Sequence, residues 1–162
     1  MTIIAELARV KVSEAEFVDR MGLIMERLGG TRTMGRLYGW LMICDPPDQS
    51  LTGLAATLGV SKTAVSTVAR QLELSGMVER VPTSAREHRY RMVGGGWDQV
   101  MRVQLAIVRQ SLDTLDFGLS IIGDDRPGQR GRLEDTREFF AFILQDSDGM
   151  FERWKEYRER SS

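Results

Sequence analysis

The side chains best suited to chemistry lie on one face of a helix that the sequence predicts after Ser61. They combine two positive charges with three hydroxyl groups, at Lys62, Thr63, Ser66, Thr67 and Arg70. Spacings of three and four residues bring such side chains to the same side of an α-helix. Hydroxyl and guanidinium groups can bond to base edges and phosphate oxygens in the major groove of DNA. This face, with Ser61 at its start, therefore predicts noncovalent binding of double-stranded DNA.

A second polar group surrounds a predicted loop further along the chain. Ser84 and Arg86 lie in the loop Pro82–Glu87, and Arg89 follows it. Arginines beside a hairpin tip can contact phosphates or enter a minor groove. A charged hairpin alone is more often only exposed to solvent. We predict that this one contacts DNA because the neighbouring helix is predicted to bind DNA.

Catalytic and metal chemistry find little support in the sequence. His88 and Cys44 are the only histidine and the only cysteine, and a structural zinc site needs four ligands. The run Gly94-Gly95-Gly96 lacks the Lys and Ser/Thr that follow in a phosphate-binding loop. We therefore predict no enzymatic activity, no cofactor and no metal site. A buried structural thiol is the favoured interpretation of Cys44, and redox sensing is the alternative.

Two helices joined by a tight turn must position the polar face. The apolar residues of the first helix are Leu54, Ala55 and Leu58. Gly59 is suited to end that helix in a left-handed conformation, and Ser61 is suited to cap the next one. The second helix ends near Gly76, and its apolar residues are Val65, Val68, Ala69 and Leu72. These spacings predict a helix-turn-helix.

The apolar period changes from helical to alternating after the second helix. Met77–Val81 and His88–Met92 read as two short strands with a loop between them. A turn of small residues occurs in many helical proteins, and a basic hairpin alone is unspecific. A helix-turn-helix followed directly by a basic hairpin is more specific, and this order predicts a winged helix-turn-helix that binds DNA. The alternative is a winged-helix protein–protein interaction module without DNA binding.

The distribution of charge agrees with DNA as a partner. The chain of 162 residues carries a net charge of −1. Leu51–Val93 contains six basic and three acidic residues, a net charge of +3, which leaves −4 for the rest. No signal peptide or long apolar run is recognisable, so we expect a cytoplasmic protein without membrane association.

Two further helices are predicted before the helix-turn-helix. Ser13 and Glu16 form a capping-box pattern that would open a helix ending at Gly29-Gly30. The next helix covers Thr31–Ile43, where Gly35 and Gly39 lie one turn apart. Glycine is costly inside a helix, so this pair predicts close packing against another backbone. Asp45-Pro46-Pro47-Asp48 then breaks the helix, and Ser50 is suited to cap the first helix of the motif.

The C-terminal part predicts long helices after a flexible joint at Gly94-Gly95-Gly96. One apolar stripe repeats at spacings of four and three, through Met101, Leu105, Val108, Leu112, Leu115, Leu119 and Ile122. Such heptads predict a homodimer interface, and packing against the chain's own helices is the alternative. After a loop at Gly123–Gly128 another helix follows, which we expect Asp146-Ser147-Asp148-Gly149 to interrupt.

Several motifs, in order along the chain, resemble the DNA-binding region of GbsR-type regulators of the MarR superfamily. They are Gly35-Arg36-Leu37-Tyr38-Gly39, Cys44-Asp45-Pro46-Pro47, Leu54-Ala55, Gly59-Val60-Ser61, Ser66 and Gly76-Met77-Val78-Glu79-Arg80-Val81. The resemblance covers Thr31 to Met92. It implies a homodimeric winged-helix transcriptional regulator. Members are mostly repressors, and some respond to small molecules, the founding type to choline. By the match, the residues that fall on the recognition helix are Ser61, Lys62, Thr63, Ser66, Thr67 and Arg70. Those that fall on the wing are Ser84, Arg86 and Arg89.

We therefore predict a mainly α fold with a small β-hairpin wing, namely a winged helix-turn-helix plus a helical dimerisation region. The predicted domains are an N-terminal helical dimerisation segment (1–30), a DNA-binding domain (31–95) and a C-terminal helical dimerisation region (96–162). The protein would bind a palindromic operator as a homodimeric repressor. A small-molecule effector could bind among Tyr38, Trp40 and Trp97, although aromatic residues are more often part of a core.

Overall fold

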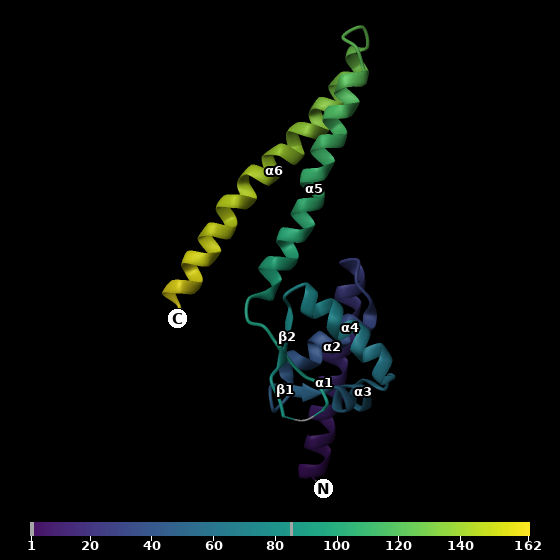
Figure 1. Ribbon diagram of the computed structural model, residues 1–162, viewed down its shortest axis with the longest axis vertical. Coiled ribbons are helices and arrows are strands. Elements are labelled where there is room, and N and C mark those ends of the chain that lie inside the picture. Colours follow the sequence, from purple (N-terminus) through teal and green to yellow (C-terminus); the bar gives the residue numbers. More distant parts are fainter. Residues whose placement is uncertain (1, 85) are drawn as a thin grey trace. The chain divides into compact units, whose positions relative to one another are not determined.

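The computed structural model describes residues 2–84 and 86–162, with side chains from residue 12 onward. The elements are α1 (Thr2–Arg27), α2 (Arg32–Ile43), β1 (Asp48–Ser50), α3 (Leu51–Leu58), α4 (Lys62–Leu74), β2 (Val78–Val81), β3 (Arg89–Met92), α5 (Gly96–Ile121) and α6 (Pro127–Arg160) (Figure 1). The chain divides into two compact units, one ending at Gln99 and one covering Val100–Ser162. The predicted mainly helical fold with a small β wing is confirmed.

Helices α1 and α2 pack closely in the first unit because α2 carries glycines on the side that faces α1. A Cβ atom on Gly35 would lie 2.3 Å from the carbonyl oxygen of Met21, and one on Gly39 would lie 2.8 Å from the Met21 Cβ. Real Cβ atoms do not approach other atoms this closely, so only glycine allows the observed helix separation. The predicted close approach is confirmed, and the neighbouring backbone is that of α1.

The helix-turn-helix has the predicted caps and turn. The Ser50 hydroxyl oxygen accepts a hydrogen bond from the Gly53 N–H at 3.0 Å and caps α3, and Gly59 ends α3 with φ = 65°. The Ser61 hydroxyl oxygen accepts from the Ala64 N–H at 3.1 Å and caps α4. The apolar face of α4 is buried, at Val65, Val68, Ala69 and Leu72. Local sequence therefore determines both helices and their junction.

The wing belongs to a three-stranded antiparallel sheet rather than to a hairpin alone. The strand order is β1-β3-β2, with Gln49 opposite Tyr90 and Arg80 opposite Tyr90 on the other side. Tyr90 is 2% exposed and lies in the core. The strand β1 was not predicted, because three residues are too short to show an alternating pattern.

Two predicted helix boundaries are wrong. Helix α1 continues through the Ser13–Glu16 pattern, which therefore opens no helix, and α6 continues through Asp146–Gly149. Inside α6 the buried Ser147 hydroxyl donates to the Leu144 carbonyl at 2.8 Å, so this polar side chain is satisfied within its own helix. Capping residues and weak helix formers are tolerated inside long helices whose neighbouring turns propagate the structure.

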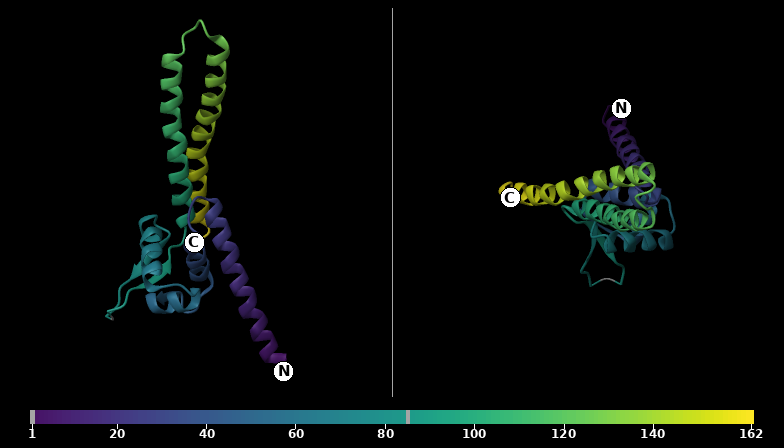
Figure 2. Two further views of the ribbon diagram at one scale, coloured as in Figure 1. Left: turned by 90° about the vertical axis from the view of Figure 1, so that its right-hand side faces the viewer. Right: turned by 90° about the horizontal axis from the view of Figure 1, so that it is seen from above.

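The second unit is an antiparallel pair of helices joined by a turn (Figure 1), and α5 and α6 lie side by side in the left view of Figure 2. Its turn is held by Arg130, whose guanidinium donates to the carbonyls of Leu119 and Ile122 at 3.0 and 2.6 Å. Arg137 of α6 forms an ion pair with Asp116 of α5. The guanidinium carbon of Arg102 lies 4.2 Å from the ring centre of Phe151, a cation–π contact.

The predicted joint at Gly94-Gly95-Gly96 is only partly a loop. Gly95 has φ = 85° and lies in a turn, but Gly96 is buried and begins α5. A Cβ atom on Gly96 would lie 2.9 Å from the Met77 Cα. The absence of a side chain at Gly96 therefore allows close packing against Met77, the residue before β2, and the expectation of a flexible joint is wrong for Gly96.

Candidate nucleic-acid interface

Helix α4 presents the predicted polar face to solvent. Lys62, Thr63, Thr67 and Arg70 are exposed, and Ser66 is half-buried. The Thr67 hydroxyl donates to the Thr63 carbonyl at 3.0 Å, and the Ser61 hydroxyl accepts the cap bond. Within residues 12–84 and 86–162, no ion pair is formed by Lys62 or Arg70. The face thus keeps positive charge and hydrogen-bonding groups available to a partner in solution.

The wing residues have two different environments. Ser84 and Arg86 are exposed near the loop tip. Arg89 instead pairs with Asp48 across the β1–β3 pair, with Nε 2.5 Å from the carboxylate, and its second nitrogen donates to the Asp48 carbonyl at 2.9 Å. Hydrogen bonding from Arg89, together with its charge, lowers the pKa of Asp48. Arg89 therefore ties the base of the wing together, while Arg86 stays available for an external anion.

Glu87 connects the wing to the first turn of α3. Its carboxylate accepts hydrogen bonds from the backbone N–H and the hydroxyl of Thr52, the former at 2.5 Å. These bonds lower the pKa of Glu87, and the charges of Lys62 and Arg89 lower it further. A carboxylate is stabilised at a helix N-terminus because free N–H groups and the helix dipole favour negative charge. The wing is thus attached to the helix-turn-helix by an anionic group.

Glu87 and Asp48 were not singled out from the sequence. Their partners lie 35 and 41 residues away along the chain. The spacing of apolar residues indicates only contacts within a few residues along the chain. Hydrogen-bonded pairs between distant residues therefore leave no pattern in the local sequence.

The three aromatic residues proposed for an effector do not share one site. Tyr38 is 1% exposed, and its ring packs edge-on against Trp97 with the ring centres 5.7 Å apart. Burial raises the pKa of Tyr38, opposed by a hydrogen bond from Trp97. Trp40 instead lines a separate cavity formed by α1, α2 and α3. Tyr38 and Trp97 therefore make a core contact, which stabilises the start of α5 on α2.

The heptad stripe of α5 is largely half-buried within the second unit. Met101 is 43% exposed, whereas Leu105, Val108, Leu112, Leu115, Leu119 and Ile122 are all half-buried. A methyl group on Gly118 would lie 3.4 Å from the side chain of Leu133 on α6, so the two helices are in contact there. These observations favour packing between α5 and α6, the alternative given above for this stripe.

Cys44 lies at the end of α2 and is half-buried. Its thiol is within 3.7 Å of the Leu41 carbonyl and 3.6 Å of the Pro47 carbonyl. Burial raises the pKa of the Cys44 thiol, and the nearby carboxylates of Asp48 and Asp45 raise it further. A raised pKa lowers the thiolate fraction, which fits the structural interpretation of this residue.

The arrangement of α3, the turn, α4 and the β1-β3-β2 sheet defines a winged helix-turn-helix protein. Among the described residues no helix is both long and apolar enough to cross a bilayer. A family model for MmpR5-like MarR family transcriptional regulators matches residues 95–158.

Similar proteins extend this match to most of the chain. The HTH-type transcriptional regulator MmpR5 of Mycobacterium tuberculosis is 35% identical over 129 residues, which cover 79% of this chain and 78% of MmpR5. A crystal structure of a transcriptional regulator superposes with a TM-score of 0.72 at 32% identity and covers 89% of this chain and 99% of that one. The chain belongs to the MarR family of transcriptional regulators and is MmpR5-like.

One more distant structure shares the fold alone. The archaeal chromatin protein TrmBL2 superposes with a TM-score of 0.51 at 19% identity, over 66% of this chain and 43% of that one.

Proposed function

We propose that this regulator binds double-stranded DNA as a homodimer, with α4 in the major groove and the wing on the flanking backbone. The observation that supports this best is the contrast between paired and available cations. Arg80, Arg89 and Arg91 each have a carboxylate partner. Within the described residues Lys62, Arg70 and Arg86 form no ion pair, and all three are exposed. Phosphate contacts need such available cations.

The division of labour follows from the chemistry of each position. Arg70 and Ser66 lie where an α4 in the groove would meet base edges, together with Thr63 and Thr67. Ser61, Lys62 and the wing residues Ser84 and Arg86 lie where they would meet phosphates and sugars. Arg89 contributes to DNA binding indirectly. Its ion pair with Asp48 holds the wing in place, and its charge is already neutralised by that carboxylate.

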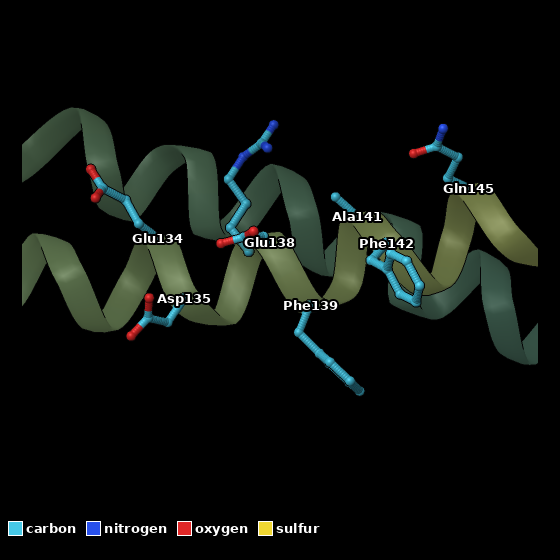
Figure 3. Close-up of a pocket in the computed structure, with 8 residues that line it drawn as sticks. Glu134, Asp135, Glu138, Phe139, Ala141, Phe142 and Gln145 are labelled. Carbon is cyan, nitrogen blue, oxygen red and sulfur yellow. The ribbon is translucent and has the colours of Figure 1, made fainter.

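The second unit supplies a surface for dimerisation. Several large apolar side chains of α5 and α6 are 55–65% exposed, at Ile107, Phe117, Ile121, Phe139 and Phe142. Figure 3 shows Phe139 and Phe142 projecting from α6, beside acidic residues that line a shallow surface hollow. Large apolar side chains that are exposed in this way mark interaction surfaces when they adjoin one another, as Phe139 and Phe142 do around the hollow. We propose that this surface, together with Met101 of the predicted stripe, packs against a second copy of the chain.

A two-fold dimer would present two copies of α4 to two half-sites, and hence bind a palindromic operator. We further propose that the protein represses transcription by occupying its operator and that it acts in the cytoplasm. The GbsR-type subgroup stays a prediction that rests on the order of motifs between Thr31 and Met92.

Selection of genomic DNA fragments on the purified full chain tests the proposal. The wild type should enrich fragments with inverted repeats, and the variant Ser66→Ala/Arg70→Ala should lose this enrichment while keeping its circular dichroism spectrum. The exposed pair Arg132→Ala/Thr136→Ala on α6 is the matched control and should behave as the wild type. Failure of the wild type to enrich any sequence would favour the protein–protein interaction module instead.

A further inference from the structure

Arg36 of α2 bonds to two other helices of the first unit. Its Nε donates to the Asp19 carboxylate of α1 at 3.0 Å, and its Nη1 donates to the backbone carbonyl of Leu58 at 3.1 Å. Leu58 is the last residue of α3. A single guanidinium therefore connects α1, α2 and the end of α3, where the turn to α4 begins.

The Arg36 side chain is also held along its aliphatic part. A Cβ atom on Gly22 of α1 would lie 2.9 Å from the Arg36 Cγ, so this side chain lies against the α1 backbone. It is 27% exposed, compared with 59% for the side chain of Arg32, one turn earlier in α2. A guanidinium that is already fixed by packing and by a carboxylate loses little conformational entropy when it forms a further bond. The bond to Leu58 therefore constrains α3 rather than Arg36.

Arg36 supplies the end of α3 with a cation that this helix lacks. No basic residue lies in the last turn of α3, and the last carbonyls of a helix have no partner inside it. The N–H groups of Gly59 and Val60 both bond to the Ala55 carbonyl. The Leu58 carbonyl instead accepts from Arg36, whose positive charge is favoured at the negative end of the helix dipole. Arg36 is thus a C-terminal cap that comes from another helix.

The position of α4 depends on this end of α3. Only Gly59, Val60 and Ser61 separate the two helices. The turn is bonded to α3 through Ala55, and the Ser61 hydroxyl caps the first turn of α4. Because the connection is short and bonded at both ends, a displacement of the end of α3 is transmitted to α4.

We infer that Arg36 is a positioning residue for DNA recognition, which fixes the end of α3 on α1 and thereby sets the orientation of α4 in the major groove. Contacts to base edges depend on the placement of α4, whereas attraction to phosphates acts on every sequence. Arg36 therefore contributes to the discrimination between DNA sequences without touching DNA. This inference rests on the DNA-binding mode proposed above.

Arg32 provides a matched comparison within α2. Its Nε donates to Glu26 of α1 at 2.9 Å, and its Cγ also lies 2.9 Å from the Cβ position of Gly22. Within the described residues no hydrogen bond or ion pair joins Arg32 to α3. Substitution of either arginine removes one ion pair between α1 and α2, but only substitution of Arg36 releases the end of α3.

Hydrogen exchange of the full chain, followed by NMR without DNA, tests the anchoring. Arg36→Gln should speed up exchange at the amides of Gly59 and Val60, because the turn that contains them loses its attachment to α1. Arg32→Gln should leave both amides as in the wild type. Unchanged exchange in Arg36→Gln, or an equal increase in both variants, would overturn the inference.

Fluorescence anisotropy on two DNA duplexes measures the consequence for recognition. One duplex is a fragment enriched by the genomic selection described above, and the other has the scrambled sequence at the same length and salt concentration. Arg36→Gln should lower the affinity for the enriched fragment by roughly fivefold, comparable with the smallest effect of one mismatched base pair. Its affinity for the scrambled duplex should not change, and Arg32→Gln should keep both affinities.

Arg36→Lys is the second variant and keeps the positive charge. A lysine ammonium lacks the planar fork that bonds to the Asp19 carboxylate and the Leu58 carbonyl together, so this variant should also lose sequence discrimination. A general loss of folded protein would instead lower both affinities in equal proportion. Such a parallel loss, or an unchanged ratio of the two affinities in both Arg36 variants, would overturn the inference. A wild type that enriches no fragment would contradict the proposed function, and the exchange experiment would then decide on the anchoring alone.

Discussion

Arg89 on β3 and Asp48 on β1 form an ion pair in which the guanidinium also bonds to the Asp48 backbone carbonyl. The pair joins the edge strand to the wing at the point where the chain enters α3. The ion pair therefore gives Arg89 a structural role close to the predicted DNA contacts. Substitution of Arg89 should affect stability, whereas substitution of Arg86 should affect DNA binding.

Arg89→Gln should lower the free energy of unfolding, because it removes a partly exposed ion pair and a hydrogen bond. Chemical denaturation of the wild type, Arg89→Gln, Asp48→Asn and the double variant measures the coupling between the two residues. Additive losses in the double variant would show that the contact contributes nothing to stability.

Acid should weaken the attachment of the wing to α3. The pKa of Glu87 is lowered from 4.5 and that of Asp48 from 3.8, so both are more acidic folded than unfolded. Their stabilisation is full above the ordinary values and is lost as pH falls through the lowered ones. The midpoint of thermal unfolding, followed from pH 7 downward, should differ between wild type and Glu87→Gln above about pH 5 and converge in acid.

The exposed residue Glu138 on α6 provides the control for this pH series. Glu138→Gln should track the wild type over the whole range, since no bond to another element holds Glu138 among the described residues. A constant difference between wild type and Glu87→Gln at all pH values would contradict the role of the Glu87 carboxylate.

Gly35→Ala should destabilise the protein by about 3 kcal/mol, because the added methyl would overlap the Met21 carbonyl of α1 and force the helices apart. Gly131→Ala in α6 is the matched substitution, since nothing lies within 4 Å of its Cβ position. This variant should gain about 0.5 to 1 kcal/mol from helix propensity. Denaturant titration of both checks the prediction, and equal effects would contradict the close packing of α1 on α2.

Phe139→Glu/Phe142→Glu should convert a dimer to a monomer, because it places charges in the exposed apolar surface of α6 proposed as the subunit interface. Sedimentation velocity at several concentrations measures the change. The control is Lys155→Glu, at an exposed position of α6 outside the hollow of Figure 3. A variant that sediments as the wild type would show that dimerisation uses another surface.

Cys44 should react slowly with iodoacetamide at pH 8 in the folded protein, because its raised pKa keeps the thiol protonated. The same chain in denaturant supplies the reference rate for an ordinary thiol. Folded protein that reacts as fast as the denatured chain would reopen the redox interpretation of this residue.

The parts of this fold that local sequence determines were predictable, and those that depend on distant pairs were not. Ser50, Gly59 and Ser61 act on residues within a few positions, so the helix-turn-helix could be derived from spacing alone. Glu87 and Thr52 meet only because the sheet folds back on α3. The heptads of α5 indicated an apolar stripe correctly, but spacing cannot state whether the partner helix belongs to the same chain.

The central claim is that α4 and Arg86 neutralise DNA phosphates, and the salt dependence of DNA binding tests it most directly. Fluorescence anisotropy at several salt concentrations gives the slope of log K against log salt for the wild type, Arg86→Ala and the control Arg132→Ala on α6. We predict a steep wild-type slope, a slope shallower by about one for Arg86→Ala and no change for Arg132→Ala. Identical slopes for wild type and Arg86→Ala, or a wild type that binds no DNA at low salt, would contradict the account.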